Sequence, residues 1–131
     1  MAFATGKRIQ PIYYDKILNR DGSVLDEEEA ASEDVFSEET TAQIKNLLRA
    51  VVEHGTAMKA KEIPRMVYGK TGTTNDFSDA WFIGFDDSLV VGVWVGRDNH
   101  VPIGNKETGA RAALPIWMEF MQKIDKYSGY K

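Results

Sequence analysis

Apolar positions recur at helical spacing in two stretches of this chain of 131 residues. The first stretch predicts a helix over residues 37–55, with Ser37 as its N-cap and Gly55 as its C-terminal stop. The expected buried stripe of this helix is Ile44, Leu47, Leu48, Val51 and Val52. His54 falls in the last turn, where we expect it to interact with the helix dipole rather than to act in catalysis.

The second stretch predicts a C-terminal helix over residues 110–126. Its regular part should begin near Leu114, because Pro115 is tolerated only in the first turn of a helix. The apolar face of this helix consists of Ala113, Ile116, Trp117, Phe120, Met121 and Ile124.

Between the two helices, residues 66–97 predict three strands. The strands are centred on Met66–Thr74, Ala80–Phe85 and Leu89–Gly96. The last two runs are apolar on both alternations, so we expect both faces of the sheet to be covered. The connection Asp86–Ser88 is short enough to make the last two strands an antiparallel hairpin.

Residues 1–36 predict a hairpin and an acidic connector. The hairpin turns at Asp21 and Gly22. Eight of the 20 acidic residues fall between positions 26 and 39. This run has the composition of a cation site, but a solvated connector that leads into the helix explains it better.

Composition narrows the class of protein. A length of 131 residues suits one domain, and 43% hydrophobic with 27% charged residues is typical of a soluble globular fold. A net charge of −4 argues against a nucleic-acid partner, and the absence of cysteine excludes disulfides and cysteine-based zinc sites. The sequence contains no apolar stretch of ~20 residues and no signal peptide, so an export signal would have to lie on a longer parent protein.

The segment 70–74, Lys-Thr-Gly-Thr-Thr, is the cluster with the clearest chemical capacity. On a strand, Lys70 and Gly72 point to one face and Thr71 and Thr73 to the other. Gly72 lets another backbone lie close, and a free strand edge can pair with an extended peptide. The hydroxyls and the lysine charge suit a carboxylate, so the segment has the chemistry of a cradle for a peptide carboxylate.

Two other interpretations of this segment compete. From these five residues alone, an edge strand with surface lysine and threonines and no function stays open. A nucleotide-binding P-loop ending at Gly69 is disfavoured, because Pro64 stands where that motif needs glycine and strands follow instead of a helix.

Other polar and aromatic residues have structural explanations. Asp76 and Asp79 are expected to cap the turn before the second strand rather than to form an acid–base pair or a metal site. The tryptophans are expected in the core rather than on a sugar-binding platform. They are Trp81, Trp94 and Trp117. We expect no metal and no cofactor.

The order of the motifs resembles the C-terminal part of the transpeptidase (penicillin-binding) domain of class A penicillin-binding proteins. The resemblance is carried by Lys70–Asp76, Asp79–Phe85, Val91–Gly96, Glu107–Ala113 and Pro115–Trp117, with Phe3–Lys7 and Val51–Thr56 upstream. It implies an α/β (α+β) fold, an antiparallel sheet flanked by helices as in part of a serine β-lactamase or transpeptidase domain. It also implies a D,D-transpeptidase that cross-links peptidoglycan stem peptides through a serine acyl-enzyme and binds β-lactam antibiotics.

The resemblance gives roles to the residues of the Lys-Thr-Gly segment. Lys70 would relay protons and keep the site positive, and the hydroxyls of Thr71 and Thr73 would hold a ligand carboxylate. The backbone N–H of Thr73 would be one of two oxyanion donors, which makes Lys70 and Thr73 the expected catalytic residues. Gly72 would let the substrate lie against the strand. Thr74 is a further substrate-binding candidate, although it is equally suited to begin the turn.

The family also carries two serine motifs, Ser-x-x-Lys and Ser-x-Asn, which normally precede the region that this chain resembles. We expect this chain to lack both. Acyl transfer has no route without a nucleophile and its base, so the chain by itself is predicted to be inactive.

The expected partners follow from the same resemblance. They are a peptidoglycan stem peptide, β-lactams, and either the remainder of the domain or a second copy, because residues 89–96 would form an unpaired strand beside an uncovered apolar face. The parent would be membrane-anchored and the domain extracytoplasmic. A β-lactam receptor or sensor domain and a non-catalytic peptide-binding module are the alternative functions.

Overall fold

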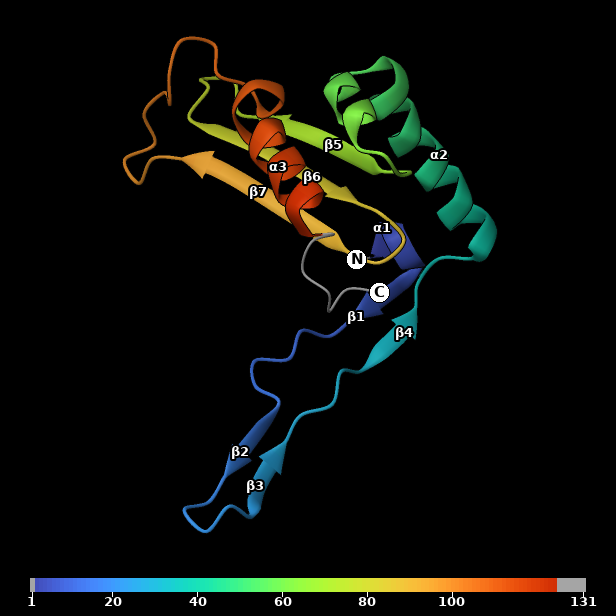
Figure 1. Cartoon of the computed structure of the whole chain (residues 1–131), viewed down its shortest axis with the longest axis vertical. Helices are drawn as coiled ribbons and strands as arrows, with labels where there is room; N and C mark the ends of the chain where they lie inside the picture. Colours follow the sequence, from blue (N-terminus) through green and yellow to red (C-terminus); the bar gives the residue numbers. More distant parts are fainter. Residues whose placement is uncertain (1, 125–131) are drawn as a thin grey trace. The chain divides into compact units, whose positions relative to one another are not determined.

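The computed structural model of the chain describes residues 2–124 and divides it into two compact units, Met1–Ala42 and Gln43–Lys131 (Figure 1). The helix α2 (Glu38–His54) begins in the first unit and ends in the second. No helix in the described part of the chain combines the length and apolar character that crossing a bilayer requires.

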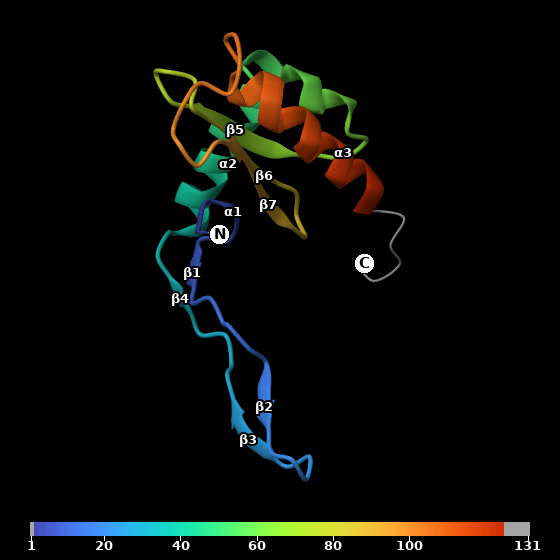
Figure 2. The same cartoon turned by 90° about the vertical axis from the view of Figure 1, so that its left-hand side faces the viewer.

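The first unit contains a short helix and two antiparallel strand pairs. Its elements are α1 (Ala2–Thr5), β1 (Lys7–Ile9), β2 (Lys16–Leu18), β3 (Val24–Glu27) and β4 (Ser32–Asp34). Strand β1 pairs with β4 and β2 pairs with β3, and Figure 2 shows β2 and β3 as a narrow ribbon closed by a turn. Gly22 occupies that turn with φ of +85°, a conformation that glycine adopts without a steric penalty. The hairpin is therefore present, as two separate ladders.

Part of the acidic run, residues 26–39, lies in the strands β3 and β4. This corrects the expectation that the run is only a solvated connector. The cross-strand ion pairs are Lys16–Glu27 at 2.8 Å, Arg8–Glu33 at 2.6 Å and Lys7–Asp34 at 3.7 Å. Basic residues of one strand thus face acidic residues of its neighbour. All six side chains are exposed, so each pair contributes at most about 1 kcal/mol.

The second unit is organised around a three-stranded antiparallel sheet in the order β5-β6-β7. Its elements after α2 are η1 (Met58–Glu62), β5 (Tyr68–Thr73), β6 (Asp79–Phe85), β7 (Val90–Gly96), η2 (Gly109–Ala113) and α3 (Leu114–Ile124). Figure 1 shows α3 lying across the strands on one face of the sheet. Within the described residues, β5 and β7 are the two edges.

The helix ends follow the sequence closely. The Ser37 hydroxyl accepts a hydrogen bond from Thr40 N at 3.2 Å, as an N-cap does. Gly55 closes α2 by donating its N–H to Val51 O at 3.0 Å. At the C-terminal helix, α3 starts at Leu114, but the preceding turn is a π-helix rather than α-helix. The predicted end at residue 126 lies outside the described residues.

One residue of the predicted α2 stripe is wrong. Leu47 is 70% exposed, whereas Val52 is fully buried. At 100° per residue, Leu47 lies roughly 140° around the helix from Val52. Burial is centred on the Val52 side, so Leu47 falls outside the stripe.

The covered face of the sheet, the one beneath α3, holds the core of the unit. Its strand residues are Gly69, Thr71, Thr73, Ala80, Phe82, Gly84, Val91, Val93 and Val95. Phe82 and Trp117 are both fully buried and meet edge to face with 5.0 Å between ring centroids. A Cβ on Gly84 would lie 2.7 Å from both rings, so glycine is needed for the helix to approach this closely.

The opposite face is only partly covered, which corrects two expectations. Near α2, the Tyr68 ring is buried against Phe85, and Lys45 lies over it at 5.5 Å. At the other end, the open face exposes three large side chains. They are Trp81 at 44%, Ile83 at 51% and Trp94 at 46% exposure. The expectation that all three tryptophans are core residues is therefore wrong. In the described residues α3 covers one face alone, so the expectation of two covered faces does not hold for this chain, whereas the uncovered apolar face beside residues 89–96 is present.

A partly buried ion pair connects the hairpin turn after β6 to the end of α3. Asp86 Oδ1 accepts hydrogen bonds from Ser88 N at 2.8 Å and Leu89 N at 2.9 Å, and Oδ2 accepts from Arg65 Nε at 2.7 Å. Arg65 Nη2 also donates to Met121 O at 2.9 Å. Burial alone would raise the pKa of Asp86, but the hydrogen bonds from Ser88, Leu89 and Arg65 outweigh it and lower the pKa below its usual value.

This lowered pKa gives the chain an acid-sensitive contribution to stability. A carboxyl whose pKa is lower in the folded state contributes stability that is complete above the unfolded pKa of about 4 and is lost as pH falls through the folded pKa. Asp86→Asn should cost about 2 kcal/mol at pH 7. Between pH 5 and pH 3, the unfolding free energy, measured in urea, should fall less steeply for Asp86→Asn than for the unchanged chain. Parallel slopes would contradict this account.

Candidate active site

The Lys-Thr-Gly segment forms the outer strand of the sheet. The register of β5 on β6 pairs Lys70 with Ile83 and Gly72 with Trp81, which places these residues on the open face. Thr71 and Thr73 therefore lie on the covered face. The alternation predicted from the sequence agrees with this register, and no bulge interrupts it.

Backbone groups of β5 point away from the sheet at alternate residues. Thr74 N donates to Asp79 O at 3.1 Å, so residues 74, 72 and 70 direct their backbone groups toward β6. The N–H and C=O groups of Thr71 and Thr73 consequently point to the outer edge. This edge thus offers the Thr73 N–H as a donor and a backbone with which an extended peptide can pair.

Lys70 lies at this same edge. Its side chain is exposed, and Nζ donates to Thr71 O at 2.7 Å and to Thr71 Oγ1 at 3.4 Å. A cation is thereby held next to the hydroxyl and to the outward carbonyl of the following residue. An anionic ligand bound along the strand would meet this charge first.

Both threonine hydroxyls have a partner from another element. Thr71 Oγ1 lies 2.8 Å from Thr56 Oγ1, in the turn after α2. Thr73 Oγ1 accepts a hydrogen bond from the backbone N–H of Gly109, the first residue of η2, at 3.0 Å. Sequence reasoning missed Thr56 and Gly109 as site residues, although both stand in segments that carry the family resemblance.

Gly109 also makes the closest backbone approach in the site. A Cβ on this residue would overlap the carbonyl oxygen of Trp81 and lie 2.6 Å from Gly72 O. The missing side chain of Gly109 thus permits the close approach on the covered face. A Cβ on Gly72 would instead meet the Trp81 side chain at 3.2 Å, on the open face.

Thr74 belongs to the turn between β5 and β6. Its hydroxyl lies 3.0 Å from Ser78 Oγ and accepts the N–H of Asp79 at 2.9 Å. Asp76 caps the same turn by accepting from Ser78 N at 3.3 Å and Ser78 Oγ at 2.9 Å. Hydrogen bonds from Thr74 and Ser78 lower the pKa of Asp76. Asp79 Oδ2 also accepts from Ser78 Oγ in this turn, at 3.1 Å. Its Oδ1 accepts a hydrogen bond from Trp94 Nε1 at 2.8 Å, a cross-strand contact that the sequence did not indicate.

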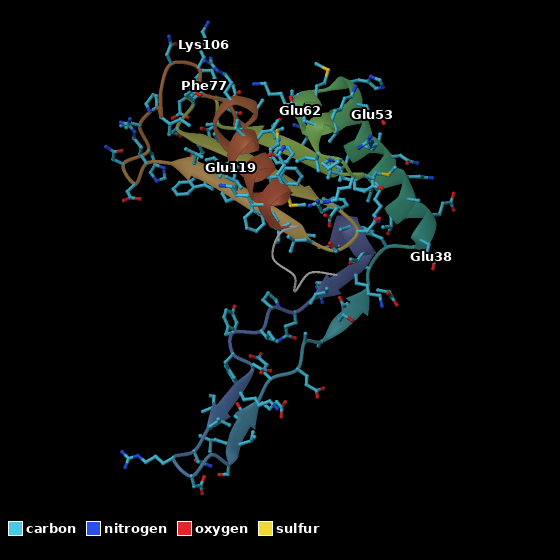
Figure 3. The ribbon with its side chains drawn as sticks, viewed as in Figure 1. Glu38, Glu53, Glu62, Phe77, Lys106 and Glu119 are labelled. Carbon is cyan, nitrogen blue, oxygen red and sulfur yellow. The ribbon has the colours of Figure 1, made fainter. Side chains whose placement is uncertain are left out.

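The loop after β7 is joined to this turn. Ile103 N donates to Phe77 O at 3.0 Å. Phe77 and Lys106, which Figure 3 labels at the same end of the sheet, both have positive φ, at 59° and 56°. This loop leads directly into Gly109, the first residue of η2.

A cavity of about 310 Å³ separates the turn after α2 from η2. Its lining residues include Thr56, Met58 and Lys59 from the side of α2, and Arg111 and Leu114 from the side of η2 and α3. The Arg111 guanidinium is directed to the preceding loop, with Nη2 3.8 Å from Glu107 Oε1. The cavity therefore lies beside the two residues that hold the threonine hydroxyls.

His54 has Glu53 as its partner rather than a residue of this site. It is exposed at the end of α2, with Nε2 3.8 Å from Glu53 Oε2. In residues 2–124, no three His, Asp or Glu side chains converge as metal ligands.

This arrangement of helices around an antiparallel sheet is part of a serine β-lactamase-like transpeptidase fold. Penicillin-Binding Protein 1A from Haemophilus influenzae matches it with a TM-score of 0.85 at 23% identity, over 99% of this chain and 26% of that one. The D,D-transpeptidase domain of a peptidoglycan glycosyltransferase from Eggerthella lenta matches with a TM-score of 0.70 at 25% identity, over 95% and 30%.

Sequence comparison gives the family. The profile of the penicillin binding protein transpeptidase domain matches residues 1–122, and the chain belongs to this family. Penicillin-binding protein 1A of Aquifex aeolicus (strain VF5) is 43% identical over 121 residues, which cover 92% of this chain and 17% of that protein. Penicillin-binding protein 1A of Rickettsia bellii (strain RML369-C) is 37% identical over 144 residues, covering 92% and 18%. The chain thus spans less than a fifth of the length of these curated relatives.

The expectation that the chain lacks a Ser-x-x-Lys sequence needs a correction. Ser128 is followed three residues later by Lys131. This pair lies outside the described residues, and it follows the Lys-Thr-Gly segment, whereas the family motif precedes it. No serine of the chain is followed by asparagine at the second position, so Ser-x-Asn is absent from the sequence.

Proposed function

We propose that this chain supplies the Lys-Thr-Gly wall of a D,D-transpeptidase site, which cross-links peptidoglycan stem peptides through a serine acyl-enzyme and is acylated by β-lactams. The observation that carries the proposal is the outer edge of β5. The Lys70 ammonium group and the Thr73 N–H lie along it. The Thr71 and Thr73 hydroxyls lie on the covered side of the same strand, where they meet Thr56 and Gly109. A peptide or β-lactam with a carboxylate matches this set in charge and in donors.

Each group has a separate task in this proposal. Lys70 supplies positive charge and relays protons, while the hydroxyls of Thr71 and Thr73 donate to the ligand carboxylate. The Thr73 N–H donates to the oxyanion that forms when the carbonyl is attacked. Loss of one such donor typically costs ~3 to 4 kcal/mol of transition-state stabilisation. The serine nucleophile and its base come from outside the described residues.

The chain by itself should form no covalent adduct with penicillin, because the groups that attack and accept the proton are not part of the Lys-Thr-Gly wall. Intact-mass spectrometry of the 131-residue chain after incubation with excess penicillin should show the unmodified mass. An adduct of stoichiometric yield would contradict this, and peptide mapping would show whether Ser128 carries it.

The positive test joins this chain to a relative. In the chimera, residues 1–122 of this chain, which match the family profile, replace the corresponding segment of the Aquifex aeolicus Penicillin-binding protein 1A, a relative that is 43% identical over 121 residues. The chimera should be acylated by fluorescent penicillin at a rate within about tenfold of the unaltered relative. Failure of a folded chimera to react would refute the proposal. Acylation without cross-linking of stem peptides would favour a β-lactam receptor.

We further propose that the open face and the edge of β7 need a partner, either the rest of the domain or a second copy. Trp81, Ile83 and Trp94 form an exposed apolar patch on β6 and β7, and β7 is an edge strand in the described part of the chain. Such surfaces associate. Light scattering of the 131-residue chain should show oligomers at concentrations of about 100 μM. A stable monomer at that concentration would count against this proposal.

The site would act outside the cytoplasmic membrane, on a longer membrane-anchored protein, because cell-wall peptides are its proposed substrate. Protease added to spheroplasts should then cleave the segment that contains β5. Complete protection of this segment would contradict an extracytoplasmic location.

A further inference from the structure

We infer that Thr56 and Gly109 are positioning residues that aim the hydroxyl protons of Thr71 and Thr73 at the carboxylate of the ligand. The inference rests on the proposed function of β5, and it adds two residues that lie outside the strand. Neither residue would touch the reacting atoms. Each would act through the hydroxyl that it holds.

The contact between Thr56 and Thr71 decides the direction of one proton. A hydroxyl has one proton to donate, and the two oxygens are 2.8 Å apart. If Thr71 donates to Thr56, it has no proton left for a ligand. If Thr56 donates, the Thr71 proton is free, and Lys70 Nζ at 3.4 Å from the same oxygen adds a second donor to it. With an anionic ligand present, the second arrangement is favoured, because it ends the chain of donors on the negative charge.

The contact between Gly109 and Thr73 has only one direction. The backbone N–H of Gly109 donates, so Thr73 Oγ1 accepts at 3.0 Å and its proton must point elsewhere. The position of this N–H is set by the lack of a side chain, since a Cβ would overlap the Trp81 carbonyl and crowd Gly72 O. The segment cannot carry a larger residue here without lifting η2 and its N–H from the sheet.

The two contacts have the same effect on the threonine that they hold. In each, an element from outside β5 satisfies the oxygen of a threonine, and the hydroxyl proton stays available at the ligand edge. Thr56 lies 15 residues before Thr71, and Gly109 lies 36 residues after Thr73. The cavity between these two elements is lined by Thr56 on one side and by Ala110 on the other.

The experiment uses the chimera, penicillin G and its methyl ester, which lacks the carboxylate. Thr56→Val should slow acylation by penicillin G about fivefold, the loss expected for one hydrogen bond, and Thr56→Ser should restore the rate to within about twofold. With the methyl ester, Thr56→Val and the unchanged chimera should react at equal rates. Thr56 is exposed, so the melting temperature should change by no more than about 2 °C.

Gly109 is tested by a double-mutant cycle. Gly109→Ala should slow acylation by penicillin G about tenfold, and it should have less than a twofold effect when Thr73 is already valine. An unchanged rate for Thr56→Val would overturn the inference. Equal slowing with penicillin G and with the ester, or additive effects in the cycle, would assign both residues a purely structural role and would also overturn it. A chimera that does not react at all would instead refute the proposed function, and this inference with it.

Discussion

Replacing Lys70 with alanine in the chimera should lower the rate of penicillin acylation by about 100- to 1,000-fold, a loss in the range of a positioned acid–base group. The reason is the place of its ammonium group, 2.7 Å from Thr71 O at the edge where the ligand would lie. No other element in the described part of the second unit brings a lysine into hydrogen-bonding distance of β5 backbone. Stopped-flow or gel-based labelling with fluorescent penicillin measures the effect.

Lys61→Ala is the matched control. Lys61 is an exposed lysine of η1 in the same unit, and its removal changes the net charge by the same amount. It should leave the acylation rate within about twofold. If Lys70→Ala retained more than a tenth of the rate, the charge at β5 would not be part of the reaction.

Phe82→Ala should destabilise the 131-residue chain by about 3 to 5 kcal/mol, whereas Ile83→Ala should cost less than about 1 kcal/mol. The two residues are neighbours on β6 and point to opposite faces. Phe82 is fully buried against Trp117, and Ile83 is 51% exposed on the open face. Urea unfolding followed by circular dichroism measures both. Similar losses for the two variants would mean that the open face is covered in solution, as self-association would do.

Local sequence patterns predicted the positions of the strands well, but they did not predict which face of the sheet is buried by other elements. Side chains alternate between the two faces of a strand, so Lys70 and Thr71 must face opposite ways whatever lies around them. The observed register therefore agrees with the predicted alternation. Apolar residues on both alternations of β6 show only that both faces can be buried. Trp81 and Trp94 are exposed because α3, which follows from the same chain, covers the face of Phe82 and leaves theirs open. No local signal distinguishes a face covered by the chain itself from one left for a partner.

In the candidate site, too, features that are local in the sequence were predicted, and features that depend on long-range contacts were not. The Lys-Thr-Gly strand was visible in the sequence because its residues are consecutive. Thr56 and Gly109 were not, because their role depends on contacts across 15 and 36 residues that only the fold brings together. Likewise, the predicted hairpin of the first unit was found, but the cross-strand ion pairs that occupy its acidic residues depend on a register that composition cannot supply.

The uneven burial of the three tryptophans has a practical consequence for spectroscopy. Trp117 is sealed beneath α3 beside Phe82, while Trp81 and Trp94 are about half exposed, with ring centroids 6.3 Å apart. The fluorescence of the chain therefore has a component shielded from acrylamide and a component accessible to it. Any molecule that settles on the open face would shield the second component and leave the first unchanged, so quenching distinguishes coverage of this face from a general change in the fold.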